Sequence, residues 1–334
     1  MPPRLRRSAT RLAVLVSLVG AAAQAFAAEP SGGRAGQDAR SDGVSDREDA
    51  LDDATSTVEQ NVTAAQPTPP QPRALNLRIT APFDFNSNAR ERGWNASPAL
   101  EGDPEVELGW SRALSTVPLK LSIKLRADTD RFAGVPQADE DEASAAFKAQ
   151  YYDATNDQVL APFVSYKSTA MFQPTFSPWT QTKNDFNLGL TKSFNFDASL
   201  RQLPPAPRSS TSAVWSVTVT ASVQRRLRTP IPDSTALIGG IEVGYVPAKS
   251  WNILLGVTNT ERWYDTATIR SRTVTRRDFK VEPLLTVAWE PPGDWFGSPV
   301  IALQVGFEQQ ISTLSRANYN QWTVGPTLSA GWKF

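Results

Sequence analysis

The side chains of this sequence that could do chemistry are carboxylates and basic groups, because its 334 residues include no His and no Cys. A catalytic Ser or Cys normally depends on a neighbouring His, and protein zinc sites are built mainly from His and Cys. We therefore expect no catalytic triad, no metal site and no cofactor. The sequence also has no glycine-rich phosphate loop and no basic run interleaved with aromatic residues, so we expect no nucleic-acid partner.

Carboxylate-only chemistry remains open at one place. Asp278 and Glu282 lie close enough in the sequence to act together as a general acid and a general base. The bases Arg276 and Lys280 alternate with them, however, and this alternation is typical of a ladder of ion pairs. We therefore predict that the protein is not an enzyme.

Charged and apolar residues alternate along most of the chain after residue 72. Leu119 and Leu121, for example, alternate with Lys120 and Ser122. A period of two indicates a strand with one apolar and one polar face. The sequence predicts about twelve strands, at residues 75–85, 105–110, 119–126, 143–153, 159–172, 182–194, 212–227, 234–246, 250–263, 273–290, 298–311 and 319–334.

Two architectures fit this pattern: a soluble sandwich or barrel whose apolar faces meet inside, and a membrane barrel whose apolar face meets lipid. Aromatic residues favour the membrane barrel, because indole and phenol rings prefer the two interfaces of a bilayer. Toward one end of the predicted strands lie Trp110, Trp215, Trp251, Trp289 and Trp332. Toward the other end lie Trp263, Tyr264 and Trp322. We predict an all-β, transmembrane, antiparallel up-and-down barrel over residues 73–334.

The predicted connections bear on the orientation of this barrel, because bacterial membrane barrels have short periplasmic turns and longer outer loops. If the chain enters from the periplasm, the periplasmic turns are 113–117, 154–158 and 247–249, which are short. The outer loops are 86–102, 132–142 and 264–272, which are longer. Two connections, 228–233 and 201–211, do not follow this trend.

Two further segments precede the predicted barrel. Residues 1–28 have a basic start, an apolar run and small residues before a cleavage point, which is typical of a secretory signal peptide. An uncleaved N-terminal anchor is the alternative. Residues 29–72 are acidic, rich in Pro and small or polar residues, and without an apolar period. They predict a disordered periplasmic linker.

The last predicted strand, from Trp322 to Phe334, alternates apolar with small or polar residues and ends in Phe. It resembles the last strand of Gram-negative outer-membrane β-barrel proteins, a porin-like class, and the resemblance in pattern extends over 73–334. The resemblance implies insertion into the lipid of the cell outer membrane and recognition of Trp332 and Phe334 by the barrel-assembly machinery. Enzymes of this class depend on His, which this chain lacks. Pro326 departs from the pattern and predicts a bulge or a seam.

If the apolar residues face lipid, the charged residues between them face the lumen. The predicted pore-lining residues are Arg78, Glu105, Glu107, Lys120, Lys124, Arg126, Arg226, Arg276, Asp278, Lys280 and Glu282. Asp84, Lys148, Lys167, Glu242, Arg262, Gln304 and Glu308 share this face. We expect Glu105 and Glu107 across from Lys124 and Lys120 in one hairpin. Because charges buried without water are costly, the lumen is either a wet channel or a well-paired network.

The number of strands favours the channel, because about twelve strands leave a narrow lumen that long charged side chains constrict. Small residues on the last strand, Gly325, Ser329 and Gly331, are expected to leave room. We predict a narrow passive channel for small hydrophilic solutes. Anions would be favoured by a basic stripe of Lys120, Lys124, Arg126, Arg226 and Lys280.

Two alternatives stay open. The lumen could be closed, with charges that only brace the barrel. The protein could also be a non-transporting envelope barrel whose tail, 29–72, binds a periplasmic partner or whose loops contact ions. The run from Asp139 to Glu142 could hold Ca²⁺ or Mg²⁺, although four adjacent acids are more often a solvated loop.

Overall fold

The computed structural model describes residues 75–89, 97–114, 116–207, 213–230, 232–265, 267–269, 272–293 and 295–334. The predicted signal peptide, 1–28, and linker, 29–72, lie outside the described residues. Within the described ranges, no helix has the length and hydropathy needed to cross a membrane.

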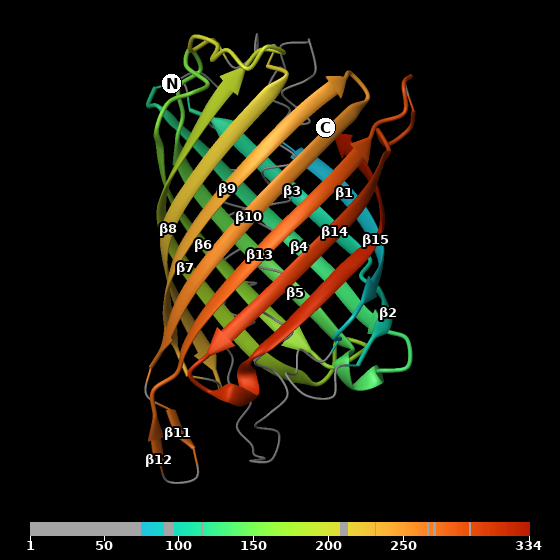
Figure 1. Ribbon diagram of the computed structural model, residues 1–334, viewed down its shortest axis with the longest axis vertical. Coiled ribbons are helices and arrows are strands. Elements are labelled where there is room, and N and C mark those ends of the chain that lie inside the picture. Colours follow the sequence, from blue (N-terminus) through green and yellow to red (C-terminus); the bar gives the residue numbers. More distant parts are fainter. Residues whose placement is uncertain are drawn as a thin grey trace, which may run out of the picture. The chain divides into compact units, whose positions relative to one another are not determined.

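Antiparallel strands form a closed barrel (Figure 1). The described part of the chain has twelve long strands: β1 (Leu75–Asn86), β3 (Glu105–Ala113), β4 (Leu119–Phe132), β5 (Glu140–Tyr151), β6 (Ala161–Phe172), β7 (Trp179–Phe196), β8 (Trp215–Thr229), β9 (Ser234–Ala248), β10 (Trp251–Tyr264), β13 (Arg277–Trp289), β14 (Val300–Ser312) and β15 (Tyr319–Lys333). Each pairs with its neighbours in chain order, and β15 pairs with β1 to close the barrel. The prediction of an up-and-down, all-β transmembrane barrel is confirmed.

Short elements decorate one end of this barrel. β2 (Ala99–Gly102) lies beyond the start of β3 and pairs with β1 and β4, so the two strands occupy one position in the wall. β11 (Ala267–Ile269) and β12 (Arg272–Val274) form a separate hairpin that extends below the barrel in Figure 1. Two single-turn helices, η1 (Pro136–Ala138) and η2 (Ser315–Ala317), complete the described connections at this end.

The two ends of the barrel are named here by their place in the chain. The terminal end holds the start of β1 and the end of β15, and the far end holds η1, η2 and the β11–β12 hairpin (Figure 1). Connections at the terminal end span 114–118, 152–160, 197–214, 249–250 and 290–299. Connections at the far end span 87–98, 133–139, 173–178, 230–233, 265–276 and 313–318.

The expected contrast between short turns at the terminal end and long loops at the far end is present in part. Connections 114–118 and 249–250 are short and 87–98 and 265–276 are long, whereas 197–214 and 230–233 are the two expected exceptions, so the two sets of lengths overlap. The described first part of the long connection 197–214, residues 197–207, is bonded to the terminal end of the barrel. Gln202 bridges to Phe196, and the backbone N–H of Ala206 donates to Asp157 Oδ1 over 3.0 Å. Length therefore does not distinguish the ends of this barrel.

Apolar side chains cover the outer face of the barrel wall, and polar side chains line its inner face. Phe83, Leu188 and Ile241 are 57%, 63% and 55% exposed, whereas Asp185 and Arg226 are 3% and 0% exposed. A soluble sandwich would bury the apolar face instead. This inside-out distribution is what a lipid-facing wall requires, and it excludes the soluble alternative.

Aromatic residues form the two predicted belts with one exception. Trp215, Trp251, Trp289 and Trp332 all lie at the terminal ends of their strands, and Trp263 and Trp322 lie toward the far end. Trp251 packs against Trp289 with ring centroids 6.4 Å apart. Tyr264 does not belong to a belt: it directly follows the outward-facing Trp263, so strand alternation turns its ring into the lumen, where it is buried.

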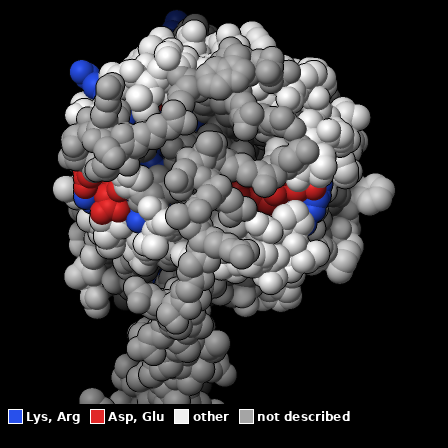
Figure 2. Space-filling model, turned by 90° about the horizontal axis from the view of Figure 1, so that it is seen from below, with Lys and Arg blue, Asp and Glu red and all other residues white. Residues whose placement is uncertain are grey.

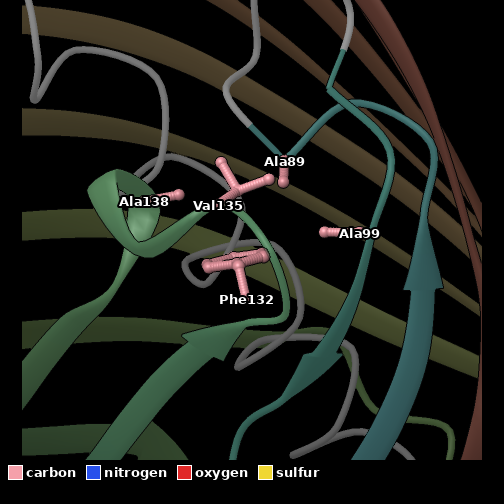
Figure 3. Close-up of a cluster of buried hydrophobic side chains, with 5 residues drawn as sticks. All are labelled: Ala89, Ala99, Phe132, Val135 and Ala138. Carbon is pink, nitrogen blue, oxygen red and sulfur yellow. The ribbon is translucent and has the colours of Figure 1, made fainter.

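The described apolar core is small and lies at the far end. It consists of Ala89, Ala99, Phe132, Val135 and Ala138, which come together where the connection after β1 meets β2, β4 and η1 (Figure 3). A barrel wall one residue thick leaves little room for an apolar core elsewhere. This cluster fixes the connections at the edge of the far end.

Two ladders of the barrel are interrupted at prolines, which cannot donate a backbone hydrogen bond. The described register between β15 and β1 skips Gly325 and Pro326. The register between β13 and β14 skips Glu282 and Pro283. The interruption predicted at Pro326 therefore coincides with the seam that closes the barrel.

Candidate functional site in the lumen

The strands place all of the predicted pore-lining residues on the inward face of the wall. Arg78 lies on β1, Glu105 and Glu107 on β3, Lys120, Lys124 and Arg126 on β4, Arg226 on β8, Arg276 just before β13, and Asp278, Lys280 and Glu282 on β13. Five of them are deeply buried: Glu107, Arg226, Arg276, Asp278 and Lys280. All of these except Glu107 lie toward the far end, so most of the buried charges are found there.

The β3–β4 hairpin carries the first group of ion pairs. Lys124 Nζ lies 3.1 Å from Glu107 Oε2. Arg126 bridges two carboxylates, with its nitrogens 3.4 Å from Glu105 Oε2 and 3.1 Å from Asp128 Oδ1. Lys124 and Arg126 are thus both neutralised by acids of the same hairpin.

The register of this hairpin differs from the expected one. β3 continues to Ala113, which lies opposite Lys120, so that Glu107 faces Arg126 and not a lysine. Lys124 reaches Glu107 diagonally, from its own position opposite Gly109. The predicted placements of Lys124 opposite Glu105 and of Lys120 opposite Glu107 are therefore both wrong, although opposite charges do pair across this hairpin.

The β7–β8 wall holds the most deeply buried pair. Asp185 lies opposite Arg226, and the guanidinium donates to both carboxylate oxygens, with 2.7 Å from Nε to Oδ1 and 2.9 Å from Nη2 to Oδ2. Nearer the far end, Lys183 Nζ lies 3.4 Å from Glu142 Oε1. Both pairs link neighbouring or next-nearest strands across the inner face of the wall.

Tyr264 lies between two arginines in this region. The Cζ atoms of Arg276 and Arg228 are 4.3 Å and 5.3 Å from the centroid of its ring. Arg276 also forks onto Asp278, with Nε to Oδ1 3.0 Å and Nη2 to Oδ2 2.5 Å. A phenol ring stacked with guanidinium groups stabilises them without neutralising their charge.

β13 continues with the predicted ladder. Lys280 Nζ lies 2.9 Å from Glu282 Oε1 and 3.2 Å from Glu308 Oε1 on β14, and the Tyr319 hydroxyl donates to Glu308. The expectation that Asp278 and Glu282 belong to an ion-pair ladder with Arg276 and Lys280 is confirmed. Each of these two carboxylates is engaged by a base beside it.

The lumen toward the terminal end has a different character. Inward positions there are mostly small or polar, such as Ser193 and Thr218, whose hydroxyl oxygens are 3.0 Å apart. Gly256 on β10 has so much room that a Cβ placed there would have no neighbour within 4 Å, and at Gly240 on β9 the nearest atom would be 3.8 Å away. The inner wall formed by β9 and β10 therefore borders open space.

The expected room beside the last strand is only partly present. A Cβ at Gly325 would lie 2.1 Å from the Phe83 carbonyl oxygen and 2.6 Å from the Asp84 Cα, because β1 approaches closely at the seam. At Gly331 the nearest atom would be the Leu77 carbonyl oxygen at 3.6 Å. The expectation is therefore wrong for Gly325, and the open part of the wall lies on β9 and β10.

The predicted basic stripe is not a stripe. Its members lie on β4, β8 and β13, and four of them, Lys124, Arg126, Arg226 and Lys280, are paired with carboxylates. Acidic and basic side chains also lie next to each other where the far end is viewed from outside (Figure 2). Basic charge exceeds acidic charge in a different place, on the inner wall from β7 to β10.

Several members of this region were missed from the sequence. They are Glu142, Lys183, Asp185, Arg228 and the inward Tyr264. The apolar alternation fades near the far end, where outward positions are polar, as at Arg131 and Arg225, although the strands continue. Continuing the alternation of inward residues along β8 from Arg226 identifies Arg228. Continuing it back along β7 from Asn187 identifies Asp185 and Lys183.

The acidic run from Asp139 to Glu142 is not a solvated loop. It leads from η1 into β5, and Asp141 is fully buried, with Oδ1 2.5 Å from an Arg131 nitrogen and Oδ2 accepting from the backbone N–H of Phe176 over 2.7 Å. Among the described residues, no group of three or more acidic side chains is arranged to hold a metal ion. The acids of this run instead brace the far end.

Comparisons with known proteins support the fold. No protein-family model and no curated sequence matches the chain. The structure is similar to that of an outer membrane channel from Pseudomonas putida F1, with 9% sequence identity over 79% of this chain and 100% of that chain and a TM-score of 0.50. Further matches include the NanC porin, with 11% identity over 77% and 99% of the chains and a TM-score of 0.38.

The translocator domain of the autotransporter NalP from Neisseria meningitidis also matches, with 9% identity over 86% of this chain and 98% of that chain and a TM-score of 0.40. At such low identity these similarities concern the fold alone. The chain has the fold of outer-membrane β-barrel proteins.

Proposed function

We propose that the protein is an outer-membrane channel through which small hydrophilic solutes pass passively, with a preference for anions. The apolar outer wall and the aromatic belts support a position in lipid. The polar inner wall supports a wet lumen, because so many charges without water would be very costly. In this proposal residues 1–28 direct export, and the terminal end faces the periplasm.

The observation that carries this proposal is the open space beside Gly256. If side chains filled the whole interior of the barrel, a Cβ added at an inward-facing glycine would contact other atoms. At Gly256 an added Cβ meets nothing within 4 Å. Gly256 lies opposite Glu242 on β9, and next to this pair Gly240 lies opposite Thr258. The charged groups toward the far end narrow the passage.

The preference for anions follows from the basic surplus between β7 and β10. Lys183, Arg226, Arg228 and Arg262 are buried there, and Asp185 is a buried acid among them. Asp185 and Glu242 are the acids on this inner wall, so the bases exceed the acids there by two. A surplus of one sign of charge in a low-dielectric wall concentrates the opposite ion in the passage. An anion entering this part of the lumen is attracted, whereas a cation is repelled.

Recordings from the purified full chain in planar lipid bilayers test the proposal. We expect discrete conductance steps, and in a gradient of KCl we expect a reversal potential of the sign that chloride selectivity gives. Folded protein without resolvable steps would contradict the channel. Steps with cation selectivity would contradict only the preference for anions.

A closed, non-transporting envelope barrel is the second candidate, and the ion pairs at the far end favour it. Arg226, Lys183, Asp141 and Glu142 are all buried and engaged. If these pairs seal the far end, bilayers that contain the folded protein stay silent. In that case we would expect the linker, 29–72, to bind a periplasmic partner, which pull-down with and without residues 31–70 would detect.

The last strand is proposed to take part in assembly. Trp332 lies opposite Leu77 on β1 and packs against Phe296, and the Phe334 N–H donates to the Leu75 carbonyl over 2.8 Å. The Phe334 side chain itself is 66% exposed. An exposed terminal aromatic on the closing strand is available to the barrel-assembly machinery. We further propose that the barrel has no catalytic activity, since its sequence has no His.

A further inference from the structure

The guanidinium of Arg228 is buried and has no hydrogen-bond partner among the described residues. Arg228 is 6% exposed, and none of its three side-chain nitrogens has a hydrogen-bond acceptor among the described residues. Its contact with the Tyr264 ring leaves its positive charge in place. An arginine cannot relieve this situation by losing its proton, because a guanidinium group stays protonated in folded proteins.

The group directly opposite Arg228 is another cation. The register of β7 and β8 pairs Arg228 with Lys183, and Lys183 is itself 1% exposed. The nearest acid in register, Asp185, lies one step further along β7 and forks onto Arg226. The arrangement therefore concentrates positive charge at the end of β8 instead of balancing it.

A second polar side chain without a partner adjoins this pair. Gln181 precedes Lys183 on the same inward face of β7, and it is 1% exposed. Neither its amide nitrogen nor its amide oxygen has a hydrogen-bond partner in the described part of the chain. The Gln181 amide is a hydrogen-bond donor, and it lies diagonally across from Arg228 on the same inner face of the wall.

The wider surroundings are also positive. Lys183, Arg226, Arg228, Arg262 and Arg276 contribute five positive charges, and Glu142, Asp185 and Asp278 contribute three negative charges, so the region carries a surplus of two. Arg262 donates to neutral groups, with Nη2 3.1 Å from Gln224 Oε1 and Nη1 3.4 Å from Ser234 Oγ. Burial in a low-dielectric wall makes such a surplus costly unless an anion offsets it.

We propose that Arg228, Lys183 and Gln181 form a binding site for an oxyanion, the carboxylate or phosphate group of a solute in the lumen. The planar fork of Arg228 matches the oxygens of either group, Lys183 adds a point charge, and the Gln181 amide donates a further hydrogen bond. The site accounts for both unpartnered side chains with one ligand. It rests on the proposed channel, because it gives the solute class that the passage selects.

The position of the site suits the first contact with a solute. Arg228 is the last but one residue of β8, and Arg226 with its Asp185 partner lies deeper in the wall. An oxyanion that enters from the far end therefore reaches the unpaired guanidinium before the paired one. Chloride is a single atom and cannot accept two parallel hydrogen bonds from the guanidinium, so it binds less tightly at this site.

Equilibrium binding to the folded full chain in detergent tests the site without any need for conduction. Inorganic phosphate and succinate are titrated into wild-type protein at constant ionic strength, with chloride as the reference anion. We expect saturable binding of one phosphate or one succinate per barrel. The two probes also separate the sources, because a site for phosphate alone binds the first and not the second.

Arg228→Gln is the decisive variant, since it keeps the length of the side chain and removes the charge. We expect it to weaken oxyanion binding by about tenfold or more, the loss of one charged hydrogen-bonded contact. Arg277→Gln is the matched control, because Arg277 lies at the same end but on the outer face, paired with Glu261. This control should bind the oxyanion as wild type does.

Removal of an unpaired buried charge should not unfold the barrel, and heat-modifiable migration on a gel verifies that Arg228→Gln is folded. Gln181→Leu provides a second variant, in which we expect a smaller loss of affinity, about threefold to tenfold. The site is refuted if folded wild-type protein binds neither probe, or if Arg228→Gln binds them as tightly as wild type. Binding by a barrel that shows no conductance would leave the site standing and contradict the channel.

Discussion

Asp185 and Arg226 face each other across β7 and β8 and share two hydrogen bonds of 2.7 Å and 2.9 Å in a place where neither is reached by solvent. The wall around them is one residue thick, with lipid-facing Phe186 and Leu227 on the other side. This pair is therefore a fixed point of the lumen, and loss of one partner leaves a buried charge.

Asp185→Asn should destabilise the barrel strongly. The substitution removes the charge that balances Arg226, and breaking a buried pair in this way costs about 3–5 kcal/mol. Urea unfolding of the barrel in lipid vesicles measures the loss. Glu261→Gln is the control, because the Glu261–Arg277 pair is exposed on the outer face, and its loss should cost less than about 1 kcal/mol. Equal losses in the two variants would contradict the role of burial.

Gly256→Phe should narrow the passage. Gly256 faces open space in the lumen, so a phenyl ring can enter that space without displacing the wall. We expect single-channel conductance to fall by about twofold or more. Gly239→Phe is a close match, since Gly239 has no neighbour within 4 Å either but faces outward. Its conductance should equal that of wild type, and a parallel fall would show that the ring disturbs the wall.

Gly325→Ala should weaken the seam between β15 and β1. The added Cβ would lie 2.1 Å from the Phe83 carbonyl oxygen, so one strand must move away from the other. Overpacking of this kind costs about 1–3 kcal/mol. Gly331→Ala lies on the same strand, where the nearest atom would be 3.6 Å away, and it should be neutral. The temperature at which the compact gel form converts to the unfolded form compares the two variants.

Arg225→Gln should raise the pKa of Asp265. Asp265 lies in the connection after β10, outside the wall, and hydrogen bonds from Arg225, with Nη1 3.0 Å from Oδ1 and Nη2 2.6 Å from Oδ2, lower the pKa of its carboxyl below the ordinary value of 3.8. The variant should return this pKa toward 3.8, as followed by carboxyl carbon NMR.

The same contact has a pH dependence with a definite sign. Because the pKa of Asp265 is lower in the folded protein, the contact contributes stability above the unfolded pKa and loses it as the pH falls through the folded pKa. The wild-type advantage over Arg225→Gln should therefore shrink in acid. An advantage that grows as the pH falls would contradict the assignment.

Deletion of Phe334 should reduce assembly in cells more than stability in vitro. The Phe334 side chain is largely exposed, so little packing is lost, although its N–H bonds to the Leu75 carbonyl. We expect less heat-modifiable barrel in the outer membrane and a urea midpoint close to that of wild type after refolding into detergent. A barrel that assembles normally without Phe334 would remove this residue from the assembly signal.

The period of two in the sequence predicts the number of strands, their order and the face that each residue occupies. It does so because a lipid-facing wall imposes the alternation at every position along a strand. It fails at the far end, where Arg131 and Arg225 face outward. They pair with Asp141 at the start of β5 and with Asp265 in a connection, and not with acyl chains. There the strands continue beyond the last apolar outward residues, so the sequence did not predict inward-facing groups such as Lys183 and Arg228.

The contacts of the lumen depend on register, which alternation does not specify. A hairpin can slide by two residues without turning any side chain to the other face. A slide of six residues, by which Lys120 lies opposite Ala113 instead of Glu107, also keeps every side chain on its own face. Likewise, the sequence shows that Gly256 and Gly325 face inward, but only the approach of the neighbouring strand decides that one borders a space and the other a carbonyl oxygen.

The interruptions at Pro283 and Pro326 have a mechanical consequence for the last hairpin. β14 and β15 pair without a break from Val300 to Gln310, whereas the ladders on both outer sides of this hairpin skip two positions. When a force is applied at the C-terminus, the interrupted pairings on either side of the hairpin should break before the continuous pairing within it. Pulled from the membrane by a force probe, β14 and β15 should leave the wall together, as a single mechanical unit.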